Sequence, residues 1–240
     1  RKESDMTILV LDIGTSGVRA AIIGPDATIT HEVSREFLPD TPMDGLVEFD
    51  AAAYADVTID LARRALDAAG PVDAIGISNQ RASVIVWDRA TGVPVAPAQS
   101  WQDLRTIGDC LMLQAEGVFV APNQPATKAK NIWDSVDPDR TRDLCVGTPE
   151  TWLVWRLSEG RDHITDLTNA AISGMTTSDG REWDDRILGL LGLPREAMPR
   201  IVDSSGQLGV ATVLGGGRDG GGIPICGIAG DQQAALVGQG

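Results

Sequence analysis

The sequence has little from which a metal centre or a disulfide framework could be built. It contains only three cysteines and two histidines in 240 residues. Cys110, Cys145 and Cys226 are widely spaced in apolar surroundings, whereas zinc sites and disulfide-rich domains need cysteines at short, paired spacings. We therefore expect small buried thiols in a reducing compartment. His31 and His163 lie far apart in the sequence, which argues against a multi-histidine metal site or a histidine-based triad and leaves carboxylates as candidate proton acceptors.

Long apolar runs and basic patches are also missing. No window approaches the roughly 18 consecutive apolar residues of a membrane-spanning helix, and the first apolar run is too short for a signal peptide. With 34 acidic against 20 basic residues the formal charge is −14, which repels nucleic acid and anionic membranes. We expect a cytoplasmic protein without nucleic-acid or membrane partners. Backbone amides, a few basic side chains or a cation must hold any anionic ligand.

Hydrophobic residues make up 42% of the sequence, enough for the core of one large or two small domains. We expect residues 1–6 to be a disordered leader or the remnant of an upstream extension. From residue 7 on, strand and helix patterns alternate without an internal repeat or a clear linker. This pattern predicts one α/β domain cut from something longer, with a helical insert near residues 105–200.

The opening residues predict an antiparallel meander of strands over 7–12, 18–23 and 28–33, the first of them buried on both faces. Asp50 and Gly70 are the expected N-cap and stop of a helix over 50–69. Thr148 is the expected N-cap of a later helix. The remaining expected elements are strands over 72–77 and 83–87, helices over 101–113, 125–133, 149–157 and 183–191, and a glycine-rich loop and strand ending at 230.

Asp12 ends the first expected strand and is followed by the turn Gly14–Gly17. Glycines let the backbone approach a phosphate, successive N–H groups can face its oxygens, and Asp12 is suited to hold a cation through water. Arg19 adds a positive charge nearby. An ordinary hairpin with an Asx-type side-chain bond is an equally good interpretation of this motif alone.

The segment Asn79–Arg81 ends a later strand and supplies many donors, among them the planar fork of Arg81. Trp101–Arg105 places an aromatic face beside polar groups, the mixture with which proteins bind sugars. A core tryptophan with polar surface neighbours is the plainer interpretation.

Asp231 follows Gly230 at the start of the last expected helix, which barely completes two turns. A capping residue is the plain interpretation. The helix start also favours an ionised carboxylate, which is able to accept a proton from an attacking hydroxyl. We expect Gly230 to leave room for the substrate.

In their order and spacing these motifs resemble the FGGY family of carbohydrate kinases, most closely its glycerol kinase branch. The matching segments are 11–16 with Arg19, 76–81, 86–88, 101–106, 165–170, 183–185 and 227–235. The resemblance implies an actin-like (ribonuclease H-like) α/β fold, the N-terminal domain of a two-domain sugar kinase. That sugar-binding domain would span residues 7–240, and the C-terminal domain that closes over ATP is absent from the sequence.

The resemblance also implies site residues and cofactors. Asp231 would be the general base that takes the proton of the substrate hydroxyl, and Asp12 would position Mg²⁺ through water. The residues implied to bind the phosphates of ATP are Gly14, Thr15, Ser16 and Arg19. The residues implied to bind the polyol or sugar are Arg81, Trp101, Asn123, Asp231 and Gln232. ATP and Mg²⁺ are the implied cofactors, and a homodimer is left open.

Two positions depart from the glycerol kinase pattern. Ala82 replaces a Glu that follows the Asn-Gln-Arg triplet, and Asn123 replaces a substrate-contacting Tyr. Without that acceptor and that aromatic wall, we expect weaker glycerol binding and room for a longer polyol or a sugar. We also expect the isolated chain to transfer little or no phosphate, because the groups that hold ATP are absent.

Two alternatives remain open. One is an actin-like ATPase of another branch, which would share residues 12–16. The other is a non-catalytic, sugar-binding half-kinase that acts as a sensor or scaffold.

Overall fold

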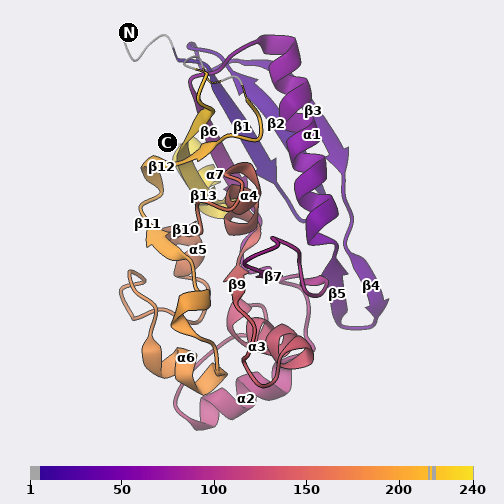
Figure 1. The fold of residues 1–240 in the computed structure, drawn as a ribbon, viewed down its shortest axis with the longest axis vertical. Coiled ribbons are helices and arrows are strands. Elements are labelled where there is room, and N and C mark those ends of the chain that lie inside the picture. The colour runs from indigo at the N-terminus through magenta and orange to yellow at the C-terminus, as the bar shows by residue number, and fades with distance from the viewer. Residues whose placement is uncertain (1–5, 216, 218–219, 240) are drawn as a thin grey trace.

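The computed structural model describes residues 6–215, 217 and 220–239. The expected leader therefore falls, apart from Met6, outside the described residues. The centre of the structure is a six-stranded sheet. Its strands are β1 (Ile8–Ile13), β2 (Gly17–Ile23), β3 (Ile29–Glu36), β6 (Ala74–Asn79), β12 (Ser205–Ala211) and β13 (Ile223–Gly230). They lie in the order β12-β13-β6-β1-β2-β3 (Figure 1).

The strand pairing brings three carboxyl ends to one edge of the sheet. β1, β2 and β3 form the expected antiparallel meander. β6 runs parallel to β1, and β13 runs parallel to β6. Because parallel strands end on the same side, the residues that follow β1, β6 and β13 become neighbours.

Helices cover one face of this sheet. α1 (Ala51–Ala69) and α4 (Pro149–Leu157) pack on the face to which Leu9 and Leu11 point (Figure 1). On the opposite face Asp12 is only half-buried. The expectation that the first strand is buried on both faces is therefore wrong, and its alternating burial is that of a sheet packed mainly on one side.

Local signals set the ends of these helices. The Asp50 carboxylate accepts a hydrogen bond from a first-turn N–H at 3.0 Å, and Gly70 ends α1 with a φ of 84°. Pro149 begins α4 as expected, but the Thr148 hydroxyl donates to Glu150 at 2.5 Å instead of capping the helix.

None of the helices in the described part of the chain combines the length and the apolar character that crossing a membrane requires.

A second body with its own apolar core lies below the sheet in Figure 1. Its core includes Ile132, Trp133 and Leu191, each at most 2% exposed. The elements outside the central sheet are β4 (Asp40–Met43), β5 (Leu46–Phe49), β7 (Ile85–Asp88), β8 (Ala98–Gln99), α2 (Ile107–Ala115), α3 (Pro125–Val136), β9 (Leu144–Gly147), β10 (Ile164–Asp166), α5 (Leu167–Ala170), α6 (Asp185–Leu191), the 3₁₀ turn Arg195–Ala197, β11 (Arg200–Val202) and α7 (Asp231–Gln239). The expected insert over 105–200 is thus mixed rather than helical, since it includes β9 and β10.

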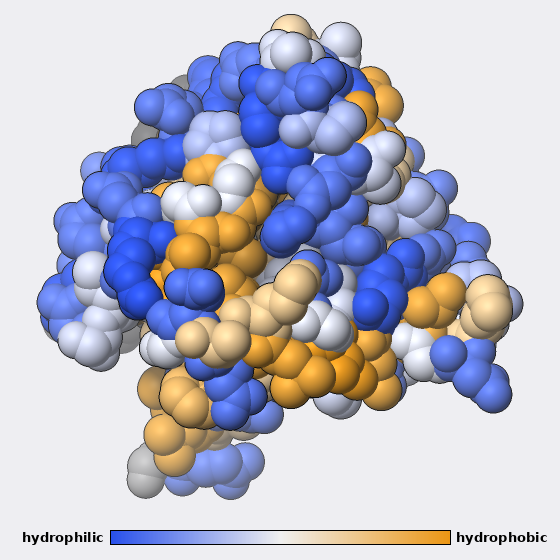
Figure 2. Space-filling model, turned by 90° about the horizontal axis from the view of Figure 1, so that it is seen from below, coloured by the Kyte–Doolittle hydropathy of each residue, from blue (hydrophilic) through white to orange (hydrophobic). Residues whose placement is uncertain are grey.

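The underside of the second body exposes apolar side chains. Figure 2 shows orange residues gathered on this face, where Figure 1 places α2. The exposed apolar residues of α2 are Ile107, Leu111 and Met112. α2 thus buries only part of its apolar surface within the described chain.

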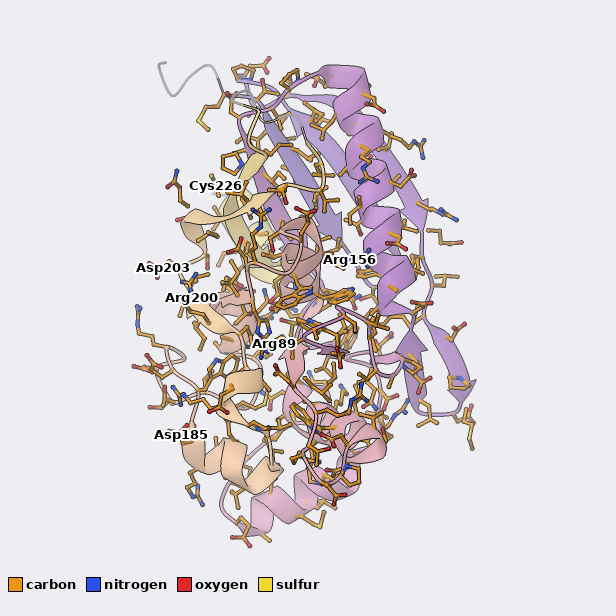
Figure 3. All side chains as sticks on the ribbon, viewed as in Figure 1. Arg89, Arg156, Asp185, Arg200, Asp203 and Cys226 are labelled. Atoms are coloured by element: carbon orange, nitrogen blue, oxygen red, sulfur yellow. The ribbon has the colours of Figure 1, made fainter. Side chains whose placement is uncertain are left out.

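Two local expectations are wrong. The helix expected over 101–113 begins only at Ile107, because the segment before it is held in a turn: the Asp103 carboxylate accepts from the Val47 N–H at 2.7 Å. Cys226 is half-buried on β13, unlike the other two cysteines, and all three are free thiols (Figure 3). Burial raises the pKa of the Cys145 thiol to about 12, which leaves that residue a small core side chain.

Candidate active site

The residues that follow the three parallel strands lie side by side. Ile13 and Gly230 both pair with Asn79 at the last position of the sheet register. The turn after β1, the Gln80–Arg81 pair after β6 and the start of α7 after β13 therefore share one edge. Ligands of open α/β sheets bind at such carboxyl ends. We call Thr15, Arg81, Trp101, Asp231 and Gln232 the strand-end cluster.

Arg81 is the centre of this cluster. Its Nη2 donates to the Gln232 Oε1 at 2.5 Å, and its Nε lies 4.0 Å from the Asp231 Oδ1. The Arg81 side chain is 15% exposed and that of Asp231 52%. A Cβ at position 230 would lie 2.1 Å from the Arg81 Cδ. The space that glycine leaves is therefore filled by Arg81, whereas we expected it to be open for substrate.

Trp101 is connected to the cluster through Thr15. Its indole Nε1 donates to the Thr15 Oγ1 at 3.0 Å, and that hydroxyl donates to the Gln80 Oε1 at 3.2 Å. Trp101 is 38% exposed, so it is neither a core tryptophan nor a fully free surface residue. The arrangement links the turn after β1 to the segment after β6.

Tyr54 of α1 supports the same turn and was not identified from the sequence as a site residue. Its hydroxyl donates to the Gly14 carbonyl at 2.7 Å and accepts from the Gln80 Nε2 at 3.1 Å. Burial raises the pKa of this hydroxyl, which therefore stays a donor. Helical spacing showed Tyr54 only as an apolar position, and no local signal marks its contact with a residue 40 positions away.

The turn after β1 is a hairpin closed by its backbone. The Gly14 N–H donates to the Gly17 carbonyl at 2.9 Å, and the backbone N–H groups of Thr15 and Ser16 have no hydrogen-bond partner among the described residues. The Asp12 carboxylate forms no hydrogen bond or ion pair with a described residue, so the Asx-type bond is not made.

Asp12 fits a cation held through water. Within the described residues no group of three or more His, Cys, Asp or Glu side chains could hold a metal. Mg²⁺ usually keeps several waters and binds one or two carboxylates together with phosphate oxygens. Asp12 is a half-buried, unpaired carboxylate beside the turn after β1, which suits binding of a hydrated Mg²⁺ through water.

Arg19 and Asn123 lie apart from the strand-end cluster, and Ala82 has no polar side-chain atom to contribute to it. Arg19 is 54% exposed and lies 3.7 Å from Glu32. Asn123 is exposed in the turn before α3 and forms no side-chain hydrogen bond with the cluster among the described residues. Ala82 is 4% exposed with a φ of 67°, in the left-handed region.

Beneath the cluster lies a set of buried side chains that we call the buried polar network: Asn79, Glu150, Asp166, Thr168 and Asn169. All but Thr168 are at most 1% exposed. The Glu150 Oε2 accepts from the Asn79 Nδ2 at 3.0 Å, and its Oε1 accepts from the hydroxyls of Thr148, Thr151 and Thr165. Burial raises the pKa of Glu150 to about 7, while the hydrogen bond from Thr148 works against that shift. The sequence marked residues 165–170 as a motif but indicated no role for them.

Two cavities differ in their relation to the cluster. A cavity of about 310 Å³ opens beside Arg81 and is also lined by Thr168, Asp179, Arg181 and Gln233. A larger cavity of about 620 Å³, lined by Arg89 and Arg156 (Figure 3), lies elsewhere. Those two arginines are paired with Asp143 at 2.9 Å and Asp56 at 2.7 Å, so the larger cavity offers little net charge for a ligand.

Comparisons with known proteins agree with this arrangement. The model of the N-terminal domain of the FGGY family of carbohydrate kinases matches residues 7–238. Glycerol kinase 2 of Pseudomonas aeruginosa is 38% identical over 256 residues, which cover 99% of this chain and 50% of that protein. The chain thus spans about half the length of the curated relatives it matches.

Solved structures share the fold. A Plasmodium falciparum glycerol kinase with ADP superposes with a TM-score of 0.88 at 24% identity, covering 98% of this chain and 50% of that one. A ligand-bound xylulose kinase from Lactobacillus acidophilus superposes with a TM-score of 0.83 at 17% identity, covering 97% and 49%. The expected α/β fold, that of the N-terminal half of a two-domain sugar kinase, is confirmed.

Proposed function

The chain belongs to the FGGY family of carbohydrate kinases, and from this we propose that it is the substrate-holding half of an ATP-dependent polyol or sugar kinase. The reaction would move the γ-phosphate of ATP to a substrate hydroxyl. The observation that most supports this proposal is the meeting of Arg81, Asp231 and Gln232 at the ends of β6 and β13. Phosphoryl transfer needs positioning and charge neutralisation more than covalent help, and these residues provide a donor, a proton acceptor and an amide in one place.

Asp231 is the proposed general base. Its carboxylate is half exposed at the first position of α7, with one oxygen accepting from the Gln232 N–H at 2.8 Å. The other oxygen is available to a substrate hydroxyl. Arg81 lies close enough to hold a neighbouring hydroxyl and to orient the same molecule against Asp231.

Residues after β1 are proposed to face the phosphates. The N–H groups of Thr15 and Ser16 would contact phosphate oxygens, and Asp12 would hold Mg²⁺ through water. Magnesium, when bound, neutralises charge on the transferred group. That contribution matters for a chain with a formal charge of −14, which otherwise repels ATP.

The substrate is proposed to be a polyol or sugar longer than glycerol. Ala82 offers no side-chain acceptor, and the cavity of about 310 Å³ beside Arg81 adds space bordered by polar groups. Trp101 presents an exposed aromatic face that suits a carbon chain or ring. Together these features favour several hydroxyl contacts spread over a longer molecule.

Calorimetric titration of the 240-residue chain with glycerol, erythritol, ribitol, xylitol and xylulose tests the binding part of this proposal. We expect at least one of the longer compounds to bind more tightly than glycerol, and Arg81→Ala to weaken that binding by about 10- to 100-fold. No binding by any compound, or binding indifferent to Arg81→Ala, would contradict the proposed site.

Transfer is tested in a hybrid kinase, made of this chain followed by the C-terminal half of the Pseudomonas relative. We expect the hybrid kinase to phosphorylate the compound that binds and the 240-residue chain alone to transfer little or none. ATP hydrolysis that ignores every polyol would instead favour an actin-like ATPase. Polyol binding without any transfer by the hybrid kinase would favour a sugar-binding half-kinase.

A further inference from the structure

A threonine hydroxyl holds the backbone immediately before Asp231. The N–H of Gly230, the last residue of β13, donates to the Thr168 Oγ1 at 2.8 Å. The same hydroxyl donates to the Asp166 Oδ2 at 2.8 Å. Because the hydroxyl accepts one bond and donates the other, both partners fix its orientation. Thr168 therefore ties the end of β13 to a buried carboxylate.

Asp166 is a firm anchor for this tie. It is 0% exposed, and its oxygens accept from the backbone N–H groups of Thr168 and Asn169 at 3.0 and 3.2 Å. The Ser204 hydroxyl donates to it at 2.6 Å, and the Ser204 carbonyl accepts from the Ile228 N–H of β13 at 2.9 Å. The strand is thus held at two positions from the same carboxylate.

The network continues to the strand that carries Arg81. Asn79 and Asn169 exchange two amide hydrogen bonds, at 2.8 and 3.0 Å, and the Asn169 Nδ2 also donates to the Asp166 Oδ1 at 2.7 Å. Asn79 is the last residue of β6, two positions before Arg81. The ends of β6 and β13 are therefore joined by side chains as well as by the sheet ladder.

Within the described chain, Asp231 is held from the strand that precedes it and from Arg81. None of the nine residues described for α7 is buried among these residues. The attachments of α7 there are Gly230, whose N–H donates to the Thr168 hydroxyl, and Gln232, whose side-chain oxygen accepts from Arg81.

We propose that Thr168 is a positioning residue for Asp231, and that the buried polar network sets the separation of Asp231 from Arg81. This proposal rests on the proposed function for the meaning of the Asp231 position, since the carboxylate serves as base only if it faces a substrate hydroxyl. Its structural content, that loss of the Thr168 hydroxyl displaces Asp231, stands independently of any reaction.

The test compares Thr168→Val, which keeps the shape but removes the hydroxyl, with Thr168→Ser, which retains it. Thr141→Val is the matched control, because the Thr141 hydroxyl also donates to an aspartate, at 2.9 Å, in the second body. In the 240-residue chain, NMR measures the exchange of the Gly230 N–H and the carboxyl signal of Asp231, and calorimetry measures polyol affinity. Thermal unfolding shows that each variant is folded.

We expect Thr168→Val to speed Gly230 exchange by about tenfold or more, to shift the Asp231 carboxyl signal and to weaken polyol binding by about tenfold. Thr168→Ser should restore all three, and Thr141→Val should change none. An unchanged Asp231 signal in folded Thr168→Val, or a failure of serine to restore it, overturns the proposal. If the unmodified chain binds no polyol but Thr168→Val still shifts Asp231, the proposed function fails and the positioning role stands.

Discussion

The strand-end cluster and the buried polar network are neighbours that use their polar atoms in opposite ways. In the network both oxygens of Glu150 accept hydrogen bonds, and the amides of Asn79 and Asn169 satisfy each other. In the cluster the Arg81 Nε is buried without a hydrogen-bond partner and Asp231 is half exposed. A buried donor without a hydrogen-bond partner lowers stability. The unpaired Arg81 Nε is therefore consistent with the proposal that a ligand binds beside it.

The difference teaches how the site is divided. The polar groups of the network are hydrogen-bonded to one another inside the protein, whereas the cluster leaves polar groups unpaired, as the proposed ligand site requires. Substitutions in the cluster should therefore change binding and transfer at little cost in stability. Substitutions in the network should change stability and its dependence on pH.

Asp231→Asn is the largest expected effect. It removes the proposed proton acceptor, and general-base catalysis typically contributes about 10²- to 10⁴-fold, so we expect kcat of the hybrid kinase to fall by that range with unfolding unchanged. The assay is phosphate transfer to the best-binding polyol. Asp60→Asn is the control, because Asp60 is similarly exposed, at 61%, and lies 3.9 Å from Arg64 on α1. Equal kcat values for the two variants would remove Asp231 from the mechanism.

Glu150→Gln tests the network through pH. Burial raises the pKa of Glu150 from 4.5 to about 7, so the folded chain binds the proton more tightly than the unfolded chain does. Proton binding by Glu150 therefore stabilises the folded chain fully below pH 4.5, and this stabilisation is lost as the pH rises through about 7. The free energy of unfolding changes by up to about 3 kcal/mol over this range. We expect the free energy of unfolding of the unmodified chain, relative to Glu150→Gln, to fall over this range.

Chemical denaturation at pH 5 and pH 8 measures this difference. Other titrating groups are common to both proteins and cancel. Glu182→Gln is the matched control, because Glu182 is 72% exposed and should give the same difference at both pH values. A pH-independent difference for Glu150→Gln would mean that Glu150 titrates normally despite its burial.

Arg81→Ala should weaken polyol binding by about 10- to 100-fold, since hydrogen bonds from a charged donor contribute about 1.5–3 kcal/mol. Calorimetry on the 240-residue chain measures it. Arg156→Ala is the comparison, because the Arg156 side chain is also partly buried, with 28% exposed, and pairs with Asp56 away from the strand ends. Similar losses in both variants would point to a general rather than a local effect.

Ala82→Glu is the smallest expected effect and sharpens the substrate assignment. A carboxylate acceptor beside Arg81 should tighten glycerol binding by about tenfold. The φ of 67° at position 82 lies in the left-handed region and strains a glutamate and a methionine alike. The backbone cost therefore cancels when Ala82→Glu is compared with Ala82→Met. Ala82→Met, of similar length but without an acceptor, should bind glycerol no better than the unmodified chain. An equal gain for both variants would mean that bulk, not the acceptor, matters.

Short-range signals predicted much of the fold. The cap at Asp50 and the first-turn Pro149 act within a few residues, and the structure has both of them. The sheet of β4, β5 and β8 was not predicted, because its strands are only two to four residues long and because β8 pairs with β5 across about 50 positions. The helix start was wrongly placed at Trp101 for the same reason.

The site was predicted in its residues more than in its contacts. The order of motifs identified Arg81, Asp231 and Gln232, and the structure brings them together. It does not bring Asn123 or Arg19 into contact with them among the described residues. Their roles, like those of Asp12 and Ser16, remain predictions.

By itself the sequence determined the antiparallel meander, the starts of α1 and α4 and the family, because apolar periodicity, the Asp50 cap, the first-turn Pro149 and the order of motifs are local or ordered along the chain. Only the tertiary structure decided that Arg81 fills the space beside Gly230, that Tyr54 supports the turn after β1 and that Thr168 holds the backbone before Asp231. These contacts join residues that lie between 40 and 149 positions apart in the sequence. No local pattern encodes them, because they exist only once the sheet has brought its strand ends to one edge.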